Sequence, residues 1–493
     1  MKYAKPRKFD YNLVVIGAGS AGLVTSYIAS TLKAKVALIE RHKMGGDCLN
    51  TGCVPSKALI RSAKVYSYSK RAEEFGFKSS KVEFEFSDIM ERIQNVIQKI
   101  EPHDSVERYT NLGVECINGS AKIKSPYEVE VNGKTLTTRS IVIATGARPV
   151  VPPIPGLDKV DILTSENLWD IRELPKRLVV LGGGPIGSEL AQSFQRLGSQ
   201  VTLVEAQDRI MAREDDDISE HINKKFAKEG IDLKTGHLAK EIKVLNGEKI
   251  LVAQSHQGNV EIPFDQIIVA IGRRANVTGF GLEELGVTVN KQGTVDHDEF
   301  LSTNYKNIFV CGDVAGPYQF THTAAHQAYY ACVNSLFGPL TRLIPPPFNK
   351  SFKVDYSVIP WATYTDPEVA TVGHTEKSAQ YAGVDYEITT YGIDDLDRAI
   401  ADNEDHGVVK VLTEPGTDKI LGATIVASNA SDLITEFIAA MKHGFGLNAI
   451  LGTIHIYPTM AEANKYLAGN WKRKRKPEGI LNQLERFFAW LRG

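Results

Sequence analysis

Two cysteines five residues apart are the residues whose chemistry stands out in this sequence. Cys48 and Cys53 lie in the stretch GGDCLNTGCVPSKAL, between Gly45 and Leu59. Pro55 and the helix-forming residues behind it indicate that a helix begins near Cys53. The positive end of a helix dipole lowers the pKa of a thiol, which would make Cys53 a usable nucleophile or electron donor. Two structural cysteines or half of a zinc site are the alternatives, but no second pair supplies the remaining zinc ligands. The stretch therefore predicts a redox centre.

The elements that must position this pair begin with a nucleotide-binding pattern near the N-terminus. The apolar run from Tyr11 to Ile16 predicts a strand, and a glycine turn, a helix and a second strand ending in Glu40 follow it. The glycines of the turn are Gly17, Gly19 and Gly22. Glycines let the backbone approach a pyrophosphate at a helix N-terminus, and the acid binds a ribose hydroxyl. With all these parts in order, the pattern predicts a dinucleotide site.

The same plan recurs in RLVVLGGGPIGSELAQSFQRLGSQVTLVE, in the middle of the chain. Glu205 again falls eighteen residues after the last glycine, as Glu40 does in the first pattern. The glycines of this second turn are Gly182, Gly184 and Gly187. Because an enzyme with one dinucleotide needs only one such unit, the repeat predicts two nucleotides.

Three further strand ends carry binding candidates. The strand in SIVIATGARP stops at Thr145 and Gly146, and a proline-rich connection follows it. Gly272 lies in AIGRRAN, where the second nucleotide fold closes. In KNIFVCGDVAG, a short strand runs into Gly312 and Asp313, where an acid could bind the polyol chain of a cofactor. An ordinary strand-end turn explains that last pattern equally well.

Histidines occur at two places with suggestive spacing. His322 and His326 stand at i and i+4 of a predicted helix, but no third ligand is visible, so we predict no metal site. Near the end of the chain, HIYPTMAEANKY sets His455, Tyr457 and Glu462 beside a proline. These three are catalytic candidates, and a helix start after the proline is an equally good interpretation.

The last stretch combines a basic block, KRKRK, with the segment EGILNQLERFFAWLRG, whose apolar residues recur at helical spacing. A basic block beside an amphipathic aromatic helix is typical of a segment that lies on an anionic membrane surface. We favour the alternative, that this helix caps the protein's own core or the partner subunit.

Size and composition limit the remaining choices. A chain of 493 residues suggests about three domains, and its net charge of −2 provides no general attraction for nucleic acid. We see no apolar run of 18 residues and no signal-peptide pattern, which favours a cytoplasmic protein. Five cysteines are too few for a disulfide scaffold, so the close pair in a reducing compartment points to catalysis.

Taken together, these motifs resemble the pyridine nucleotide-disulfide oxidoreductases, the family of dihydrolipoamide dehydrogenases, glutathione reductases and mercuric reductases. The resemblance runs from Tyr11 to about Tyr466 and keeps the family order of motifs. It implies an α/β fold with two Rossmann-like domains, for FAD and NAD(P)H, and a C-terminal α+β dimerisation domain. The predicted limits are 9–155 and 277–347 for the FAD domain, 156–276 for the NAD(P) domain, 350–470 for the dimerisation domain and 471–493 for a basic amphipathic tail.

The resemblance also implies roles for the candidates. Cys53 would lie against the flavin as the charge-transfer thiolate, Cys48 would exchange with substrate, and Lys57 would pair with Glu189 beside flavin N5. The segment with His455, Tyr457 and Glu462 would reach the other subunit's disulfide in a homodimer. Glu205 favours NADH, since a carboxylate repels a 2′-phosphate. The expected cofactor-binding residues are Gly17, Gly19, Gly22, Glu40, Gly46, Lys57, Thr145, Gly146, Gly182, Gly184, Gly187, Glu205, Gly272, Gly312 and Asp313.

Two departures from the family pattern bear on the substrate. Tyr457 stands directly before Pro458, where dihydrolipoamide dehydrogenases and glutathione reductases have a histidine base, and this is reminiscent of mercuric reductases. Mercuric reductases, however, carry a cysteine pair near the C-terminus, and this chain has no cysteine after Cys332.

We therefore expect an FAD-dependent, homodimeric oxidoreductase that passes electrons from NAD(P)H through the Cys48–Cys53 disulfide to an external disulfide, metal ion or quinone. A flavin monooxygenase would also have two nucleotide folds, but it does not need the cysteine pair. The other alternative is a flavin redox sensor with little turnover that contacts a membrane through its basic tail.

Overall fold

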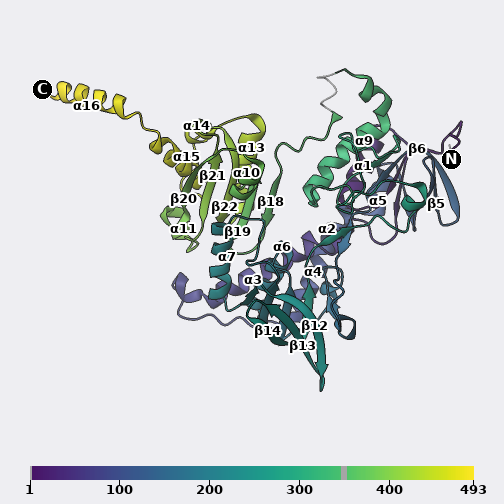
Figure 1. The fold of residues 1–493 in the computed structure, drawn as a ribbon, viewed down its shortest axis with the longest axis horizontal. Coiled ribbons are helices and arrows are strands. Elements are labelled where there is room, and N and C mark those ends of the chain that lie inside the picture. The colour runs from purple at the N-terminus through teal and green to yellow at the C-terminus, as the bar shows by residue number, and fades with distance from the viewer. Residues whose placement is uncertain (1–2, 346–351) are drawn as a thin grey trace. The chain divides into compact units, whose positions relative to one another are not determined.

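The computed structural model describes residues 3–345 and 352–493, and the chain forms two compact units (Figure 1). Unit 1 consists of Met1–Ser67, Lys81–Asp208 and Ile231–Asp355, and unit 2 of Tyr68–Ser80, Arg209–Gly230 and Tyr356–Gly493. Part of the stretch predicted as the NAD(P) domain, the segment 209–230, thus groups with the C-terminal chain. The predicted boundary between residues 347 and 350 lies outside the described residues, and the domain limits stay a prediction.

The first nucleotide pattern forms the strand, turn and helix that its sequence predicts. Strand β1 (Tyr11–Ile16) leads into α1 (Ser20–Thr31) and β2 (Val36–Glu40), and β1 pairs in parallel with β2 and β6. The sheet has the order β3-β2-β1-β6-β5-β4, and β17 pairs with β6. Its other strands are β3 (Val114–Asn118), β4 (Lys122–Ser125), β5 (Glu128–Val131), β6 (Lys134–Ile143) and β17 (Ile308–Val310).

Both faces of β1 are buried from Leu13 to Ile16, which explains the apolar sequence LVVI of these residues. Leu13 and Val15 pack in one core cluster, which also contains residues of α1 and α9 (Thr321–Leu343). Val14 and Ile16 point to the opposite face and pack in another cluster. The return of β17 to this sheet brings the segment with Gly312 and Asp313 back to the first fold.

The second nucleotide pattern forms a parallel sheet with the order β11-β10-β9-β15-β8. Helix α6 (Pro185–Leu197) follows β9 (Arg177–Leu181) and leads to β10 (Gln200–Glu205), as the repeat predicts. The other strands of unit 1 are β7 (Ala147–Pro149), β8 (Ile162–Leu163), β11 (Asp232–Thr235), β12 (Leu238–Leu245), β13 (Glu248–Ser255), β14 (Gly258–Phe264), β15 (Gln266–Val269) and β16 (Arg273–Ala275).

Unit 2 is built on an antiparallel sheet with the order β18-β19-β22-β21-β20 and has no nucleotide turn. Its strands are β18 (Pro360–Thr363), β19 (Glu368–Gly373), β20 (Glu387–Gly392), β21 (Val408–Thr413) and β22 (Ile420–Ala427). Its helices include α7 (Asp216–Lys228), α10 (Glu376–Ala382), α11 (Asp397–Ala401), α12 (Ala430–Leu433), α13 (Thr435–His443), α14 (Leu447–Gly452) and α15 (Glu462–Lys474).

The predicted tail divides into two parts. Trp471, the first residue of the predicted tail, belongs to α15 and is buried in the core of unit 2. The final helix, α16 (Glu478–Arg492), has no buried residue, so it does not cap the core of its own chain as we expected (Figure 1). None of the helices that the structure describes combines the length and apolarity needed to cross a bilayer.

Candidate functional site

Cys48 and Cys53 lie on two helices of unit 1 that follow one another along the chain. Helix α2 (Gly46–Asn50) contains Cys48, and α3 (Cys53–Lys70) begins at Cys53, where the sequence predicts a helix start. Both residues are free thiols. A hydrogen bond from Cys48 lowers the pKa of Cys53 to about 6, and Thr321 and the charge of Lys57 act in the same direction against the effect of burial. The same bond and burial raise the pKa of Cys48. Cys53 is therefore the thiolate of the pair at neutral pH.

Lys57 lies one helical turn after Cys53 and forms an ion pair with Glu189. The distance from Lys57 Nζ to Glu189 Oε2 is 2.9 Å, and the Glu189 side chain is 6% exposed. Helices α3 and α6 are thus joined across 132 residues of sequence. The structure contains the pair that the resemblance implies, and its role beside the flavin stays a prediction.

The first nucleotide turn has the shape of a phosphate cradle. Gly17 has φ +101°, and a Cβ added there would lie 2.4 Å from the carbonyl oxygen of Ala144. A Cβ on Gly22 would lie 1.8 Å from the carbonyl oxygen of Gly17, and one on Gly46 would lie 2.6 Å from the Cα of Gly19. Because no side chain caps the start of α1, its N–H groups are available to a pyrophosphate. These residues fit FAD.

The second turn repeats this geometry in detail. Gly182 has φ +103°, a Cβ on Gly187 would lie 1.8 Å from the Gly182 carbonyl oxygen, and Gly184 faces open space. Glu205 accepts hydrogen bonds from the backbone N–H groups of Gly183, at 2.6 Å, and Gln207, at 2.7 Å. These contacts fix its carboxylate at the end of β10, and the turn fits the second dinucleotide.

In the first fold, Glu40 is held in the same way. Its carboxylate accepts from the backbone N–H of Ala18, at 2.7 Å, and from that of His42, at 2.8 Å. The two acids at the ends of the two second strands are therefore equivalent in position and in hydrogen bonding. Each can accept from a ribose hydroxyl beside its glycine turn.

Two residues that the sequence analysis did not select connect the remaining binding candidates. Asn276 holds Thr145 and Gly146, since its backbone and side chain exchange three hydrogen bonds of 2.8–2.9 Å with them. Arg273 Nε lies 3.8 Å from Asp313 Oδ2, and its Nη2 binds Asp47, the residue before Cys48. Burial raises the pKa of Asp313, and the charge of Arg273 opposes this rise.

The sequence contained a weak signal for Arg273 and none for Thr321. Arg273 directly follows Gly272 in the AIGRRAN motif, and Gly272 has φ +142° with no atom near the position of a Cβ. Thr321, whose Oγ1 lies 3.3 Å from Cys53 Sγ, is 268 residues away in sequence. Gly312 has φ +81°, and a Cβ added there would lie 3.1 Å from the Cβ of Ala21 in α1.

A cavity of about 350 Å³ borders Cys53 in unit 1. Helices α3 and α4 (Phe86–Ile100) form its walls, and Lys57, Arg61 and Arg92 contribute positive charge to an otherwise apolar lining. Arg92 Nη1 donates to the carbonyl oxygen of Ala58, at 3.0 Å, which fixes this guanidinium on the wall. Such a cavity has room for a small acceptor next to the thiolate.

The three C-terminal candidates lie in unit 2, each with its own partner. His455 Nε2 lies 2.9 Å from Glu436 Oε1, and the His455 side chain is 6% exposed. Tyr457 Oη donates to Asp397 Oδ2, at 3.1 Å, and this bond raises the pKa of Tyr457 above its usual value. Glu462 is buried and is the first residue of α15, so a helix begins after the proline, as the second interpretation predicts. Their approach to another subunit stays a prediction.

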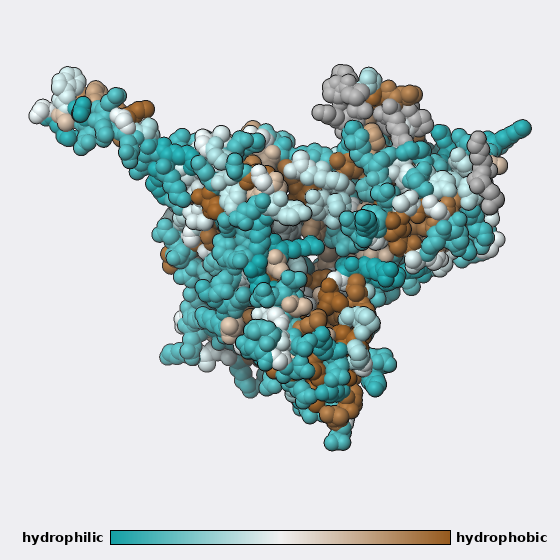
Figure 2. Space-filling view, viewed as in Figure 1, coloured by the Kyte–Doolittle hydropathy of each residue, from teal (hydrophilic) through white to brown (hydrophobic). Residues whose placement is uncertain are grey.

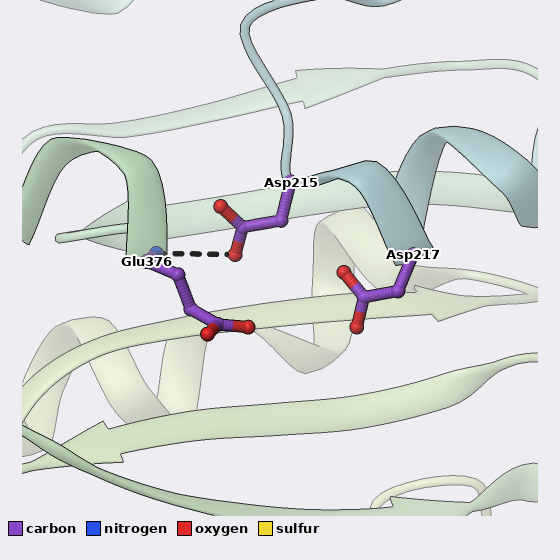
Figure 3. Close-up of side chains that lie close together, drawn as sticks. All are labelled: Asp215, Asp217 and Glu376. Carbon is purple, nitrogen blue, oxygen red and sulfur yellow. Dashed lines mark hydrogen bonds between the residues drawn. The ribbon is translucent and has the colours of Figure 1, made fainter. Parts of the chain in front are cut away.

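One further cluster of acids lies in unit 2, away from these candidates along the chain. Figure 3 shows the carboxylates of Asp215, Asp217 and Glu376 close together, with Asp215 accepting from the backbone N–H of Glu376 at 3.1 Å. Lys410, only 2% exposed at its side chain, forms ion pairs with all three, at 3.1 Å to Asp215 and 2.9 Å to Asp217. The lysine ammonium offsets part of the negative charge of this cluster and joins α7, α10 and β21.

Comparison with known proteins matches nearly the whole chain. The model of the pyridine nucleotide-disulphide oxidoreductases matches residues 11–328, and that of their dimerisation domain matches residues 359–468. A mercuric reductase of Bacillus cereus is 35% identical over 93% of this chain and 71% of its own length. A dihydrolipoyl dehydrogenase of Chlamydia muridarum is 33% identical over 92% of this chain and 95% of its own.

Solved structures give the same result. The HOCl-induced flavoprotein disulfide reductase RclA of Escherichia coli superposes with a TM-score of 0.81 at 27% identity, over 93% of this chain and 99% of its own. Its Cu(II) complex superposes with a TM-score of 0.80 at 27% identity, over 92% and 99% of the two chains.

Proposed function

The chain belongs to the pyridine nucleotide-disulphide oxidoreductases, and we propose that it passes electrons from NADH through Cys48 and Cys53 to an electrophilic acceptor, a metal ion or a quinone. It is an FAD-dependent, NAD(P)H-dependent flavoprotein oxidoreductase. When bound, the two cofactors supply the hydride chemistry that reduces a disulfide.

The cysteine pair can carry the electrons because its two sulfurs differ in protonation. With a pKa of about 6, Cys53 is a thiolate at neutral pH, while the raised pKa of Cys48 keeps that residue a thiol. Oxidation of the pair to the disulfide releases two electrons and the remaining proton, and the acceptor gains the two electrons. Lys57 supports the thiolate through its charge, and Glu189 holds the ammonium in place.

The hydrogen bond of Tyr457 to Asp397 is the observation that favours an electrophilic acceptor over dihydrolipoamide. Oxidation of a dithiol substrate needs a base with a pKa near the working pH. The bond raises the pKa of Tyr457 beyond the usual tyrosine value of about 10, so its phenol does not accept a proton near neutral pH. His455 is engaged with Glu436. An acceptor that brings no proton to remove suits this set of residues.

A homodimer in the cytoplasm completes the proposal. Unit 2 carries the family's dimerisation domain, and three apolar side chains near its C-terminal candidates are open to solvent: Phe445 at 58%, Ile454 at 93% and Ile456 at 79%. Apolar surface of this kind supports contact with another subunit. A reducing compartment would keep such a close cysteine pair available for redox exchange.

The test is anaerobic reduction of the holoenzyme with NADH, followed by mixing with lipoamide, glutathione disulfide, quinones or metal ions. We expect reoxidation by a metal ion or a quinone to be at least tenfold faster than by lipoamide. Cys48→Ser should abolish turnover with every acceptor that uses the pair. Fast lipoamide turnover would contradict the proposed acceptor class, and quinone turnover that survives Cys48→Ser would show that the quinone bypasses the cysteines. Slow turnover with every acceptor would favour a redox sensor.

A further inference from the structure

The C-terminal helix α16 presents an apolar face that the described part of the chain does not cover. On a helix with 3.6 residues per turn, its large apolar side chains fall on one half of the circumference, and Asn482 and the charged residues fall on the other half. Figure 2 shows brown side chains among teal ones on this helix, which extends from α15 in Figure 1. The apolar set, 41–74% exposed, consists of Ile480, Leu481, Leu484, Phe487, Phe488, Trp490 and Leu491.

The charge next to this face is strongly positive. Residues 471–493 contain seven Lys or Arg and two Glu, a net charge of +5 in a chain whose total is −2. Arg475 forms an ion pair with Glu387 and lies over the ring of Trp471. The other four residues of the basic block are exposed, and they are Lys472, Arg473, Lys474 and Lys476.

We propose that α16 and the basic block dock the enzyme onto an anionic lipid surface as a peripheral amphipathic helix. Lys and Arg close to an anionic leaflet are attracted to it, and the aromatic face can enter the boundary between headgroups and acyl chains. Two tails of +5 repel one another, so pairing of the tails of two copies is the less favourable arrangement. The matched family domain ends at residue 468, before the basic block and α16.

Docking determines where the enzyme works, and α16 takes no part in the redox reaction. The thiols, the glycine turns and the cavity beside Cys53 all lie in unit 1, and α16 lies in unit 2 at the end of the chain. A membrane-docked enzyme meets acceptors that partition into or cross the bilayer at raised local concentration. The docking itself does not depend on which acceptor the enzyme reduces, so either proposal can fail alone.

The test is sedimentation of the full-length holoenzyme with vesicles of phosphatidylcholine alone or with 40% phosphatidylglycerol (~0.15 M salt). We expect binding to the anionic vesicles only, and its loss at ~1 M salt. The combined change of Lys472, Arg473, Lys474 and Lys476 to Gln should weaken binding at least tenfold, as should Phe487→Ser with Phe488→Ser. The matched control on the polar face, Asn482→Ser with Ala489→Ser, should bind as the unmodified chain does.

Two further readings separate lipid docking from self-association. Trp490 should shift its fluorescence to shorter wavelength on anionic vesicles, and Trp490→Phe should remove that shift. If the Phe487 and Phe488 changes instead convert a dimer into monomers in sedimentation velocity without lipid, the apolar face is a subunit contact and the proposal is wrong. Equal binding to both kinds of vesicle, or to neither, also overturns it.

Discussion

Two cysteines with identical side chains take opposite protonation states here because of their surroundings. The hydrogen bond between them favours charge on Cys53 and disfavours it on Cys48. Thr321 lowers the pKa of both thiols, and the charge of Lys57 further lowers that of Cys53. A thiolate is the form that donates electrons or attacks sulfur, so at neutral pH Cys53, and not Cys48, is the sulfur in the reactive form.

Replacing Lys57 should raise the pKa of Cys53, because a nearby positive charge stabilises the thiolate. In the unmodified reduced enzyme, alkylation of Cys53 by iodoacetamide should slow as the pH falls through about 6. Lys57→Met should move this midpoint upward, and Glu189→Gln should move it downward, since Glu189 raises the pKa. Equal midpoints in both variants would show that the ion pair does not act on the thiol.

Losing the thiolate should also be visible in the spectrum. The resemblance places Cys53 against the flavin, so the two-electron-reduced enzyme should show a long-wavelength charge-transfer band, and Cys53→Ser should remove it. Cys48→Ser is the control, because it leaves the Cys53 sulfur in place. A band that survives unchanged in Cys53→Ser contradicts the assignment of the thiolate.

Tyr457 is the residue on which the substrate depends. Tyr457→His should raise dihydrolipoamide oxidation, because imidazole, with a pKa of about 6.5, can take the proton that the Asp397-bound phenol cannot. We expect a rise of about tenfold or more in kcat/KM for dihydrolipoamide, with Tyr457→Phe as the control for loss of the phenol. If the unmodified enzyme already turns over dihydrolipoamide at about 100 per second, Tyr457 does not limit this reaction.

At the scale of elements, the two strand–turn–helix units are copies with the same constraint at each glycine. The position of the first glycine requires positive φ, and the third glycine lies so close to the carbonyl of the first that no side chain fits. The acid at the end of the second strand is held by two backbone N–H groups in both copies. The two units share this framework, so the differences between them lie in the residues that surround it.

The acid of the second unit predicts the choice between the two nicotinamide cofactors. Glu205 can accept from a 2′-hydroxyl and repels a 2′-phosphate, while Arg209 is engaged with Asp216 at 2.8 Å. We expect kcat/KM to be higher for NADH than for NADPH, and Glu205→Gln to narrow the ratio by about tenfold, or about 1.4 kcal/mol. A higher kcat/KM for NADPH in the unmodified enzyme would contradict the assignment.

The buried lysine of unit 2 predicts a large effect on stability. Burial disfavours the charge of Lys410, but its hydrogen bonds to Glu376 and Asp217 outweigh this and raise its pKa. Lys410→Met leaves three acids without their cation and should cost about 3–5 kcal/mol, measured by urea unfolding. Lys419→Met, at an exposed pair with Glu414, should cost less than about 1 kcal/mol. Equal losses would show that the cluster contributes little.

At the scale of the whole molecule, two deletions at the C-terminus should differ in their effects on stability and on flavin chemistry. Deleting residues 477–493 should leave NADH-dependent flavin reduction within about twofold, because α16 has no buried residue. Deleting from Trp471 onward removes a side chain that is 4% exposed and should cost about 3–5 kcal/mol. Loss of FAD from the shorter deletion would show that the tail supports the nucleotide fold.

The sequence alone determined the parts of this protein that local chemistry dictates. Glycine spacing, the acids Glu40 and Glu205, and a helix start at Cys53 depend on residues close together along the chain, so their patterns could be read directly. The family resemblance added the pairing of Lys57 with Glu189. The α/β fold, the enzyme class and the cofactors followed from these.

Only the tertiary structure decided which distant residues meet. Thr321 at Cys53, Arg273 between Asp47 and Asp313, and Lys410 among its acids join segments more than 25 residues apart, and no spacing along the chain specifies such contacts. The tertiary structure also decided that Trp471 belongs to the core of unit 2, whereas α16 has no buried residue. A sequence pattern gives the apolar face of a helix, but the surface that this face contacts is set by how the rest of the chain packs.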